Sequence, residues 1–477
     1  MRDPGHRHPE LAAMFARYGE NYRWRVVVTV MLGTFAAVME ATIVNVALPD
    51  VIRAFHVGHD RVQLLSTGFL AATTASMLVS GWAMNRYGPR ATYIAALWLL
   101  MLFSVLAVFT SREQFALLAL CRIGQGAIAG LIQPLAMVSL AQVFPPEQGG
   151  RAMSAYGLGI VLSPAVGPVV GGALVDQFGW RAVFLVTLPF CLTAALLAPR
   201  YLIAARPPVH TRKKPLDVTG LALLSAGLIT LLGGLSTTFS HPPAVWVSLL
   251  LAGLALGAAF VAWQRRSTHP LLDFGLFRQP GFGAAILVTV AYGVGLYGST
   301  YLVPLFAQHA VHFSAFQAGA MLVPGGLLLA LVLPLSGRLT DRLPFHRIVL
   351  AGLACFAASA ALFALTGTGG GFWLLAAWVA LGRVGLGLMI PGLNAGALRL
   401  LAPGGEAAGS AAINFFRQLG GALGVTLLAL FLEGRQRAGG AEAAGAGGFT
   451  AGFLAVALVY ALAMIPARRM NVARPNL

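Results

Sequence analysis

Apolar segments of about 20 residues recur along the whole 477-residue chain, between charged and Pro/Gly-rich breaks. A helix of that length crosses a hydrocarbon core roughly 30 Å thick. Only 10% of the residues are charged, against about a quarter in a soluble domain. The sequence therefore predicts an all-α polytopic membrane protein with fourteen spans, near residues 25–49, 63–84, 91–110, 115–143, 151–175, 179–199, 217–236, 243–263, 281–306, 315–337, 347–367, 372–399, 407–432 and 449–467.

The basic residues are distributed unevenly between the two sides of these spans. Lys and Arg number 32 against 15 Asp and Glu, a net charge of +17. If the N-terminus is cytoplasmic, 23 of the 32 lie in the two tails and the loops on that side, and six lie on the other side. This bias follows the positive-inside rule. We expect both termini in the cytoplasm, and a lipid bilayer rather than nucleic acid as the partner.

The two halves of the chain carry related motifs. Residues 80–86 (SGWAMNR) resemble 336–342 (SGRLTDR), and 122–126 (RIGQG) resemble 383–387 (RVGLG), at offsets of 256 and 261. Six spans need only about 200 residues, so the seventh and eighth spans are interpreted as an insertion between two six-helix bundles. The expected organisation is a cytoplasmic N-tail (1–24), an N-terminal bundle (25–200), a basic cytoplasmic linker (201–216), an inserted helix pair (217–263), a cytoplasmic loop (264–280), a C-terminal bundle (281–467) and a cytoplasmic C-tail (468–477).

Glu40 is the only carboxylate well inside a predicted span. A charge at the centre of a membrane helix costs about 2.5–3.5 kcal/mol on insertion scales, which makes packing alone a poor reason to keep one there. The functional interpretation is a carboxylate that carries protons. The alternative is a permanently neutral or paired glutamate that only holds helices together, and we favour the first.

Arg122 lies at a similar depth, because it and Glu40 are each nine residues from the expected outer end of their spans. The two side chains would meet if the first and fourth spans are neighbours. Burial favours a neutral carboxyl and a nearby cation favours a charged one, so their separation would switch Glu40 between the two forms. Gln125, Ala129 and Gln133 continue the Arg122 face and are expected to line a cavity. Alternatively, Arg122 and Gln125 only satisfy backbone carbonyls.

Two more arginines, Arg383 and Arg417, lie inside predicted spans of the second half without an acidic companion. They would bind either backbone carbonyls or an anionic group of a substrate. The ten His lie in loops or at span ends and the three Cys are isolated in apolar segments, so no metal site is expected. Because no Gly-x-x-x-x-Gly-Lys-Ser/Thr motif occurs, we expect no cofactor and a proton gradient rather than ATP as the energy source.

Over nearly its full length the chain resembles the fourteen-helix drug:proton antiporters of the major facilitator superfamily (EmrB/QacA-like). Residues 39–49 (MEATIVNVALP) are similar to the first-span signature, whose acid is implicated in proton coupling in that family. Residues 81–90 resemble its loop motif, 122–130 its fourth-span arginine motif, and 157–172, with Gly-Pro-x-x-Gly-Gly, its antiporter motif. Residues 414–421 (NFFRQLGG) and 270–273 (PLLD) match later patterns.

Two positions depart from the family pattern. Glu40 stands where the family usually has Asp, and Asn85 replaces an Asp of the first loop latch, whose charge Asp341 keeps in the second copy. We expect proton coupling by Glu40 and Arg122. The residues expected to line the substrate cavity are Gln125, Gln133, Tyr292, Tyr297, Arg383, Asn394, Asn414 and Arg417. Those expected to control conformation are Gly81, Asn85, Arg86, Gly88, Arg90, Gly159, Gly167, Pro168, Gly171, Gly172, Asp341 and Arg342.

The expected function is export of amphipathic or hydrophobic drug-like compounds across the inner (cytoplasmic) membrane, by alternating access and driven by inward proton flow. The resemblance also suggests a periplasmic membrane-fusion adaptor as a partner where an outer membrane is present. One alternative is a proton-coupled uptake symporter on the same fold, against which the fifth-span motif argues. Another is an integral membrane enzyme, which would need a catalytic cluster at one membrane face that the sequence does not show.

Overall fold

The computed structural model describes residues 9–111, 113–204, 215–239, 241–402, 404–444 and 446–470, which form helices joined by short connections. Most of the predicted basic linker (205–214) and the outer parts of both predicted tails (1–8 and 471–477) lie outside the described residues. A short helix, α1 (Pro9–Tyr18), precedes the first span and packs beside it.

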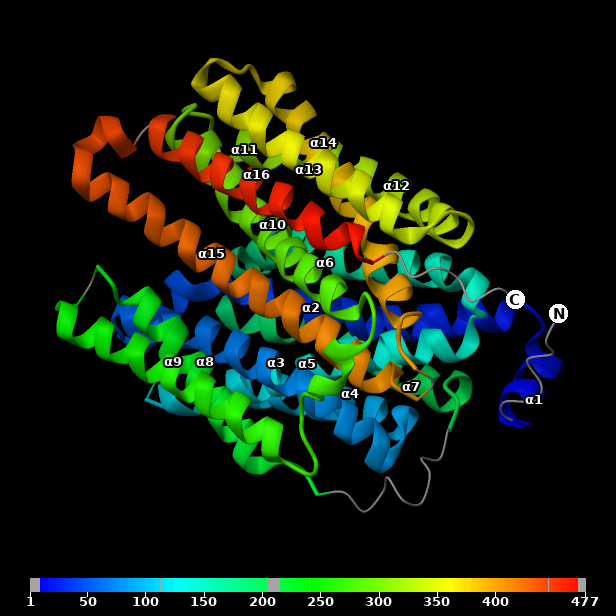
Figure 1. The fold of residues 1–477 in the computed structure, drawn as a ribbon. Coiled ribbons are helices and arrows are strands. Elements are labelled where there is room, and N and C mark those ends of the chain that lie inside the picture. The colour runs from blue at the N-terminus through cyan, green and yellow to red at the C-terminus, as the bar shows by residue number, and fades with distance from the viewer. Residues whose placement is uncertain are drawn as a thin grey trace.

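The N-terminal bundle contains six spans that run alternately in opposite directions (Figure 1). The sixth span opens with a 3₁₀ segment, Trp180–Phe184, before its α-helix. We call the end at which α2 begins and α7 finishes the basic end, and the other the opposite end. The helices are α2 (Asn21–Phe55), α3 (His59–Tyr87), α4 (Pro89–Val108), α5 (Phe115–Val143), α6 (Gly149–Phe178) and α7 (Leu188–Tyr201).

The C-terminal bundle has the same number of spans, and an extra helix pair precedes it in the chain. α8 (Val218–Ser236) and α9 (Pro243–Arg266) pack on each other, and α8 also contacts α3 and α15. The fold is thus two six-helix bundles with two added transmembrane helices. The helices of the second bundle are α10 (Phe282–His309), α11 (Ala315–Ala320) with α12 (Leu322–Arg342), α13 (Phe345–Thr366), α14 (Phe372–Pro391), α15 (Glu406–Ala444) and α16 (Ala446–Arg468).

Each predicted span corresponds to a helix, but several helices are longer than expected. In the part of the chain that the structure describes, 13 helical segments are long and apolar enough to cross a membrane. The remaining predicted span, the fifth, corresponds to α6, whose 30 residues are more than the roughly 20 that are needed to cross a membrane. The first span was expected to finish at Pro49, but α2 continues to Phe55, because a proline in a membrane helix removes one N–H bond that neighbouring groups can compensate. Glu40 therefore lies about 22 Å from the end of its helix, instead of the roughly 13 Å that nine residues would span.

The two bundles repeat the same internal contacts. α2 packs on α6 and α7, as α10 packs on α15 and α16, and α3 packs on α5, as α12 packs on α14. Between the bundles, α6 lies against α12 and α15 lies against α3. In the internal repeat α3 corresponds to α12 and α6 corresponds to α15, so the two bundles are related by a pseudo-two-fold axis. The α6–α12 seam and the α3–α15 seam are therefore the symmetry-related contacts between the bundles.

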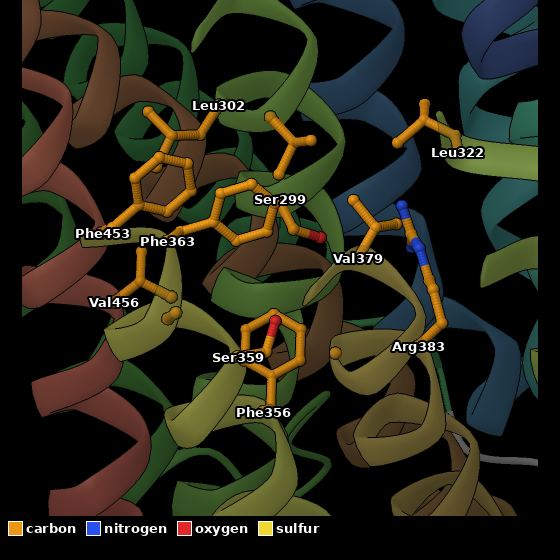
Figure 2. Close-up of a pocket in the computed structure, with 13 residues that line it drawn as sticks. Ser299, Leu302, Leu322, Phe356, Ser359, Phe363, Val379, Arg383, Phe453 and Val456 are labelled. Carbon is orange, nitrogen blue, oxygen red and sulfur yellow. The ribbon is translucent and has the colours of Figure 1, made fainter. Parts of the chain in front are cut away.

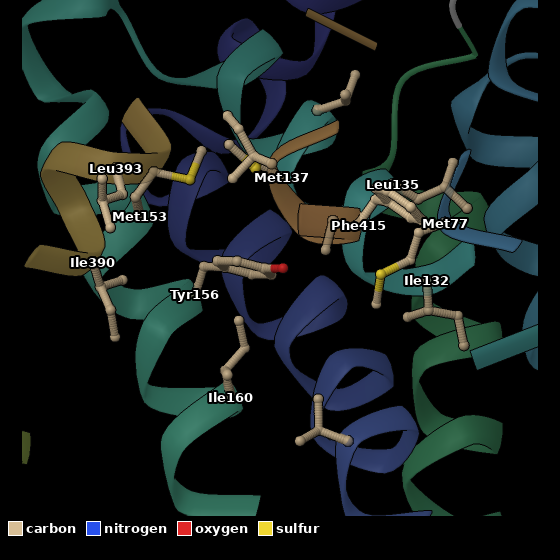
Figure 3. Packing of buried hydrophobic residues seen from close by; sticks show 14 of the residues in the cluster. Met77, Ile132, Leu135, Met137, Met153, Tyr156, Ile160, Ile390, Leu393 and Phe415 are labelled. Atoms are coloured by element: carbon tan, nitrogen blue, oxygen red, sulfur yellow. The ribbon is translucent and has the colours of Figure 1, made fainter. Parts of the chain in front are cut away.

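Glycines allow the helices within each bundle to approach closely. A Cβ on Gly126 of α5 would collide with the backbone of Phe69 in α3, and one on Gly420 of α15 with the backbone of Val290 in α10. Such close packing at small residues drives helix association in a membrane, where lipid removes the usual hydrophobic driving force. Figure 3 shows that the buried core continues from one bundle to the other, with side chains from α3, α5, α6, the end of α14, the π-helical segment Gly392–Gly396 that follows it, and α15. Among them are Met77, Ile132, Leu135, Met137, Met153, Tyr156, Ile160, Ile390, Leu393 and Phe415.

Candidate functional site

Glu40 is fully buried in α2, in the interior of the N-terminal bundle. Its Oε1 accepts hydrogen bonds from Ser104 Oγ of α4 (3.0 Å), from Gln125 Nε2 of α5 (3.2 Å) and from Thr187 Oγ1 (3.1 Å). Thr187 directly precedes α7, in the turn that follows the 3₁₀ segment. Three other spans therefore each place a polar atom on the carboxylate that α2 carries.

Arg122 of α5 completes this buried cluster. Its Nη1 lies 3.5 Å from Glu40 Oε2 and donates to Gln125 Oε1 at 2.9 Å, while its Nη2 donates to the backbone oxygen of Glu40 at 3.2 Å. The guanidinium also lies over the ring of Phe69, 4.2 Å from its centroid. The sequence-predicted neighbours Glu40, Arg122 and Gln125 are thus brought together, and only 1% of the Arg122 surface is exposed.

The hydrogen bonds of this cluster are incomplete. Glu40 Oε2 and Arg122 Nε are buried and have no hydrogen-bond partner among the described residues. A buried ion pair is stable only when its remaining lone pairs and protons are also satisfied. Glu40 Oε2 is therefore the atom at which a proton would be added with the least disruption, because Oε1 already accepts three hydrogen bonds.

Ser104 and Thr187 were not expected from the sequence. A single hydroxyl in an apolar span gives little signal, because it usually bonds to the backbone of its own helix. Here both hydroxyls turn instead to a carboxylate on another helix. The sequence gives one hint, because Ser104 is the single hydroxyl residue between Ile94 and Phe109 of the third span.

Gln133 lies on the same helix as Arg122 but belongs to a second polar cluster, between the bundles. Arg417 Nη2 of α15 donates to Gln133 Oε1 at 2.7 Å and to Asn414 Oδ1 at 2.5 Å. Tyr156 of α6 donates from its hydroxyl to Asn414 Oδ1 at 3.2 Å. We call Gln133, Tyr156, Asn414 and Arg417 the bundle junction. All four side chains are buried, and Gln133 lies about 15 Å from the basic end of α5.

A second connection between the bundles lies at the basic end. Asp341, near the end of α12, accepts hydrogen bonds from the backbone N–H groups of Gly150 (2.7 Å) and Arg151 (3.3 Å) at the start of α6. Arg399 Nη2 lies 3.1 Å from the same carboxylate. This is a favourable place for an acid, because the first N–H groups of a helix are unpaired and carry positive partial charge. We call this contact the Asp341 latch.

The repeat equivalent of Asp341 is arranged differently. Asn85 of α3 is exposed, and the structure shows it without a hydrogen bond to the described residues. The helix it would reach, α15, carries Glu406 in its own first turn. Gly81 packs more loosely than its repeat equivalent Gly337. A Cβ on Gly81 would lie 3.7 Å from the backbone oxygen of Ala407, whereas one on Gly337 would lie 2.7 Å from the backbone oxygen of Gly150. The α3–α15 seam therefore lacks both the carboxylate and the close glycine contact of its counterpart.

The other motif residues lie at helix breaks and helix contacts. Gly88, with φ of +86°, separates α3 from α4, and Arg86, Arg90 and Arg342 lie at the basic end. The glycines of α6 face α2 just beyond Glu40: a Cβ on Gly167 would meet Thr42 and one on Gly171 would meet Ile43. Gly159 and Gly172 are less tightly packed against α2, and the side chain of Pro168 lies outside the described part of the chain.

The remaining predicted cavity residues do not form one group. Tyr297 donates to Gln418 Oε1 at 2.9 Å, while the buried Tyr292 hydroxyl has no partner among the described residues. Asn394 is buried in a π-helical segment, Gly392–Gly396, that follows α14. Arg383 lines a separate cavity inside the C-terminal bundle. Among the described residues, no group of three His, Cys, Asp or Glu side chains is placed to hold a metal ion.

Comparison with known proteins identifies relatives over most of the chain. The model of the Major Facilitator Superfamily matches residues 30–425. The multidrug resistance protein B homolog of Mycobacterium tuberculosis is 32% identical over 84% of this chain and 75% of its own length. The lincomycin resistance protein LmrB of Listeria monocytogenes is 28% identical, over 87% of each chain. Among solved structures, the human organic anion transporter MFSD10 shares the fold, with a TM-score of 0.64 at 16% identity over 93% of this chain and 99% of that one.

Proposed function

Because this chain belongs to the major facilitator superfamily, we propose that it is a proton-coupled exporter of amphipathic and hydrophobic compounds that works by alternating access. The family and its relatives indicate a transporter rather than an enzyme. The names of the relatives, which refer to resistance to drugs or antibiotics, support export of drug-like molecules. The observation that carries proton coupling is the buried Glu40–Arg122 pair.

Glu40 is suited to bind and release one proton per cycle. When it is ionised, Arg122 at 3.5 Å and three donors on Oε1 stabilise the charge. When it is protonated, Oε2 carries the proton and the ion pair is lost, which weakens the contact between α2 and α5. The glycine face of α6 packs on the same stretch of α2, so a shift of α2 would be transmitted to the α6–α12 seam.

The proton gradient supplies enough energy for such export. One charge that crosses 100 mV contributes about 2.3 kcal/mol, which corresponds to about a fortyfold concentration ratio of an uncharged substrate before any pH difference is added. If the basic end is cytoplasmic, as the charge bias favours, both the bundle junction and the Asp341 latch close the cytoplasmic side. The conformation would then be the one that exchanges substrate and protons with the outside.

The proposal is tested with the full chain in proteoliposomes under an imposed pH gradient. Transport of a fluorescent amphipathic dye such as ethidium is followed together with the internal pH, reported by pyranine. Wild-type protein should move dye and protons in opposite directions, and Glu40→Gln, which keeps the hydrogen-bonding shape but not the charge, should abolish the proton flux that depends on the dye.

The matched control is Glu433→Gln, which removes a half-exposed carboxylate that pairs with Arg437 at the opposite end of α15. It should leave coupled transport unchanged. Unaltered coupling in Glu40→Gln would remove Glu40 from the mechanism. Dye and protons moving in the same direction would instead identify an uptake symporter.

A further inference from the structure

The C-terminal bundle encloses a cavity of its own, away from the bundle junction. Figure 2 shows that aromatic and aliphatic side chains, among them Phe356, Phe363 and Phe453, surround it. Its polar lining comes from Ser299 of α10, Ser359 of α13 and Arg383 of α14. A guanidinium therefore borders a largely apolar cavity in the interior of a membrane bundle.

Arg383 has no ion-pair or hydrogen-bond partner among the described residues. Its electrostatic neighbours are the phenols of Tyr292 and Tyr460, which carry no negative charge at neutral pH. Arg383 lies deep in α14, about 16 Å along the helix from its start at Phe372 and about 12 Å from its end at Pro391. Its side chain is partly exposed, but a guanidinium without a counter-charge at that depth of a membrane helix is still costly, since arginine does not lose its proton.

The internal repeat shows what is missing. Arg383 is the repeat equivalent of Arg122, at an offset of 261, and Arg122 has the carboxylate of Glu40 beside it. The two repeat offsets, 256 and 261, place the equivalent of Glu40 within residues 296–301 of α10. That segment reads LYGSTY and contains no acid. One of its residues, Ser299, lines the same cavity as Arg383.

The cavity is small and has a donor available. Its volume of about 30 Å³ is room for about two waters or one compact anion and too little for a drug-sized molecule. The Ser299 hydroxyl makes only a 3.4 Å contact with the Leu296 carbonyl, so it is free to turn toward a ligand. On the other side, Gly325 of α12 makes room for the Arg383 stem, because a Cβ there would lie 3.0 Å from Arg383 Cγ.

We propose that this cavity binds a small monovalent anion between Arg383 and Ser299, with chloride as the probe. The anion takes the place that the Glu40 carboxylate occupies in the N-terminal bundle. One bundle thus neutralises its arginine with a side chain and the other with a ligand from solution. A guanidinium and a hydroxyl together supply the donors that a halide requires, and the aromatic lining excludes larger polar anions.

The test measures binding to the purified full chain, without any transport assay. Equilibrium binding of ³⁶Cl⁻ is compared with thermal unfolding in chloride and in gluconate at constant ionic strength. Wild-type protein should bind chloride saturably at one site per chain, and its unfolding midpoint should rise with chloride concentration above the Kd. Arg383→Gln should weaken binding at least tenfold and remove the difference between chloride and gluconate.

A second variant keeps the proposal testable if Arg383→Gln does not fold. Ser299→Glu puts a carboxylate into the cavity, reproduces the pairing of the N-terminal bundle and should abolish chloride binding while the protein stays folded. Arg437→Gln, which removes an exposed guanidinium at the end of α15, is the matched control and should bind chloride as the wild type does. Saturable binding that is unchanged in Arg383→Gln or in Ser299→Glu, or the lack of a saturable site in the wild type, would overturn the proposal.

Discussion

Arg417 joins the two bundles through neutral amides instead of a carboxylate. Its Nη2 reaches Gln133 of the other bundle and Asn414 of its own helix. A charge-assisted bond to an amide holds the closed arrangement, yet it can be exchanged for water when the bundles part. An ion pair in the same buried place would be harder to separate, because both charges would have to be resolvated together.

This contrast gives a prediction at Gln133. Gln133→Glu should form an ion pair with Arg417, strengthen the contact between the bundles by about 1.5–3 kcal/mol and slow transport about tenfold or more. Gln133→Leu should weaken the same contact. The unfolding midpoint and the rate of dye transport in proteoliposomes measure both effects. Midpoints that move in the same direction in the two variants would contradict the role assigned to the junction.

Sequence reasoning found the charged residues and the amides around Glu40 and missed the hydroxyl groups. Glu40 and Arg122 stand out because a charge is exceptional in an apolar span. Ser104 and Thr187 do not, because nothing in the spacing of a hydroxyl shows whether it bonds to its own helix or to another. The pairing of Gln133 with Arg417 depends on how the bundles are set against each other, which residue spacing does not encode.

At the scale of helices, α6 connects the buried carboxylate to the bundle seam. One stretch of it packs on α2 beside Thr42 and Ile43, and its start lies on α12. The Gly-Pro-x-x-Gly-Gly pattern therefore has a packing reason, because a Cβ on Gly171 would lie 2.7 Å from Ile43 Cγ1. Motion of α2 relative to the C-terminal bundle passes through this contact.

The two neighbouring glycines of α6 provide a matched pair of variants. Gly171→Ala should overpack the α2–α6 contact, at a cost of about 1–3 kcal/mol, and impair transport. Gly172→Ala should be tolerated, because the nearest atom to its Cβ, Val46 Cγ1, is at 3.8 Å, an ordinary van der Waals distance. Thermal stability and dye transport are the measurements. Equal effects of the two substitutions would show that helix propensity, not this contact, determines the outcome.

For the whole molecule, hydropathy and the internal repeat predicted the architecture well. The apolar segments indicated the helices, and the offsets of 256 and 261 indicated two related bundles with an inserted pair. The sequence could not predict which end of the molecule is closed. A repeat specifies the contacts within each bundle, but not how the two bundles are tilted against each other. Helix ends were also misjudged, as at Pro49, because proline does not terminate a membrane helix reliably.

Closure at the basic end can be trapped chemically across the α3–α15 seam. The backbones of Gly81 and Ala408 approach closely, since a Cβ on Gly81 would lie 3.8 Å from the Cα of Ala408, which makes this pair suitable for an engineered disulfide. The Gly81→Cys, Ala408→Cys double variant should form this disulfide under mild oxidation and lose transport, and a reducing agent should restore it. Each single variant serves as the control. Full transport by the oxidised double variant would mean that the seam does not open during the cycle.

The extra helix pair gives the two seams different access to the surrounding lipid. α8 contacts both α3 and α15, so it covers the α3–α15 seam. Beside the other seam, α12 presents Leu327, Leu331 and Leu335 outward, each more than half exposed. A molecule dissolved in the bilayer can therefore approach one seam directly, while α8 shields the other. The two bundles have similar internal contacts, but their lipid-facing surfaces differ.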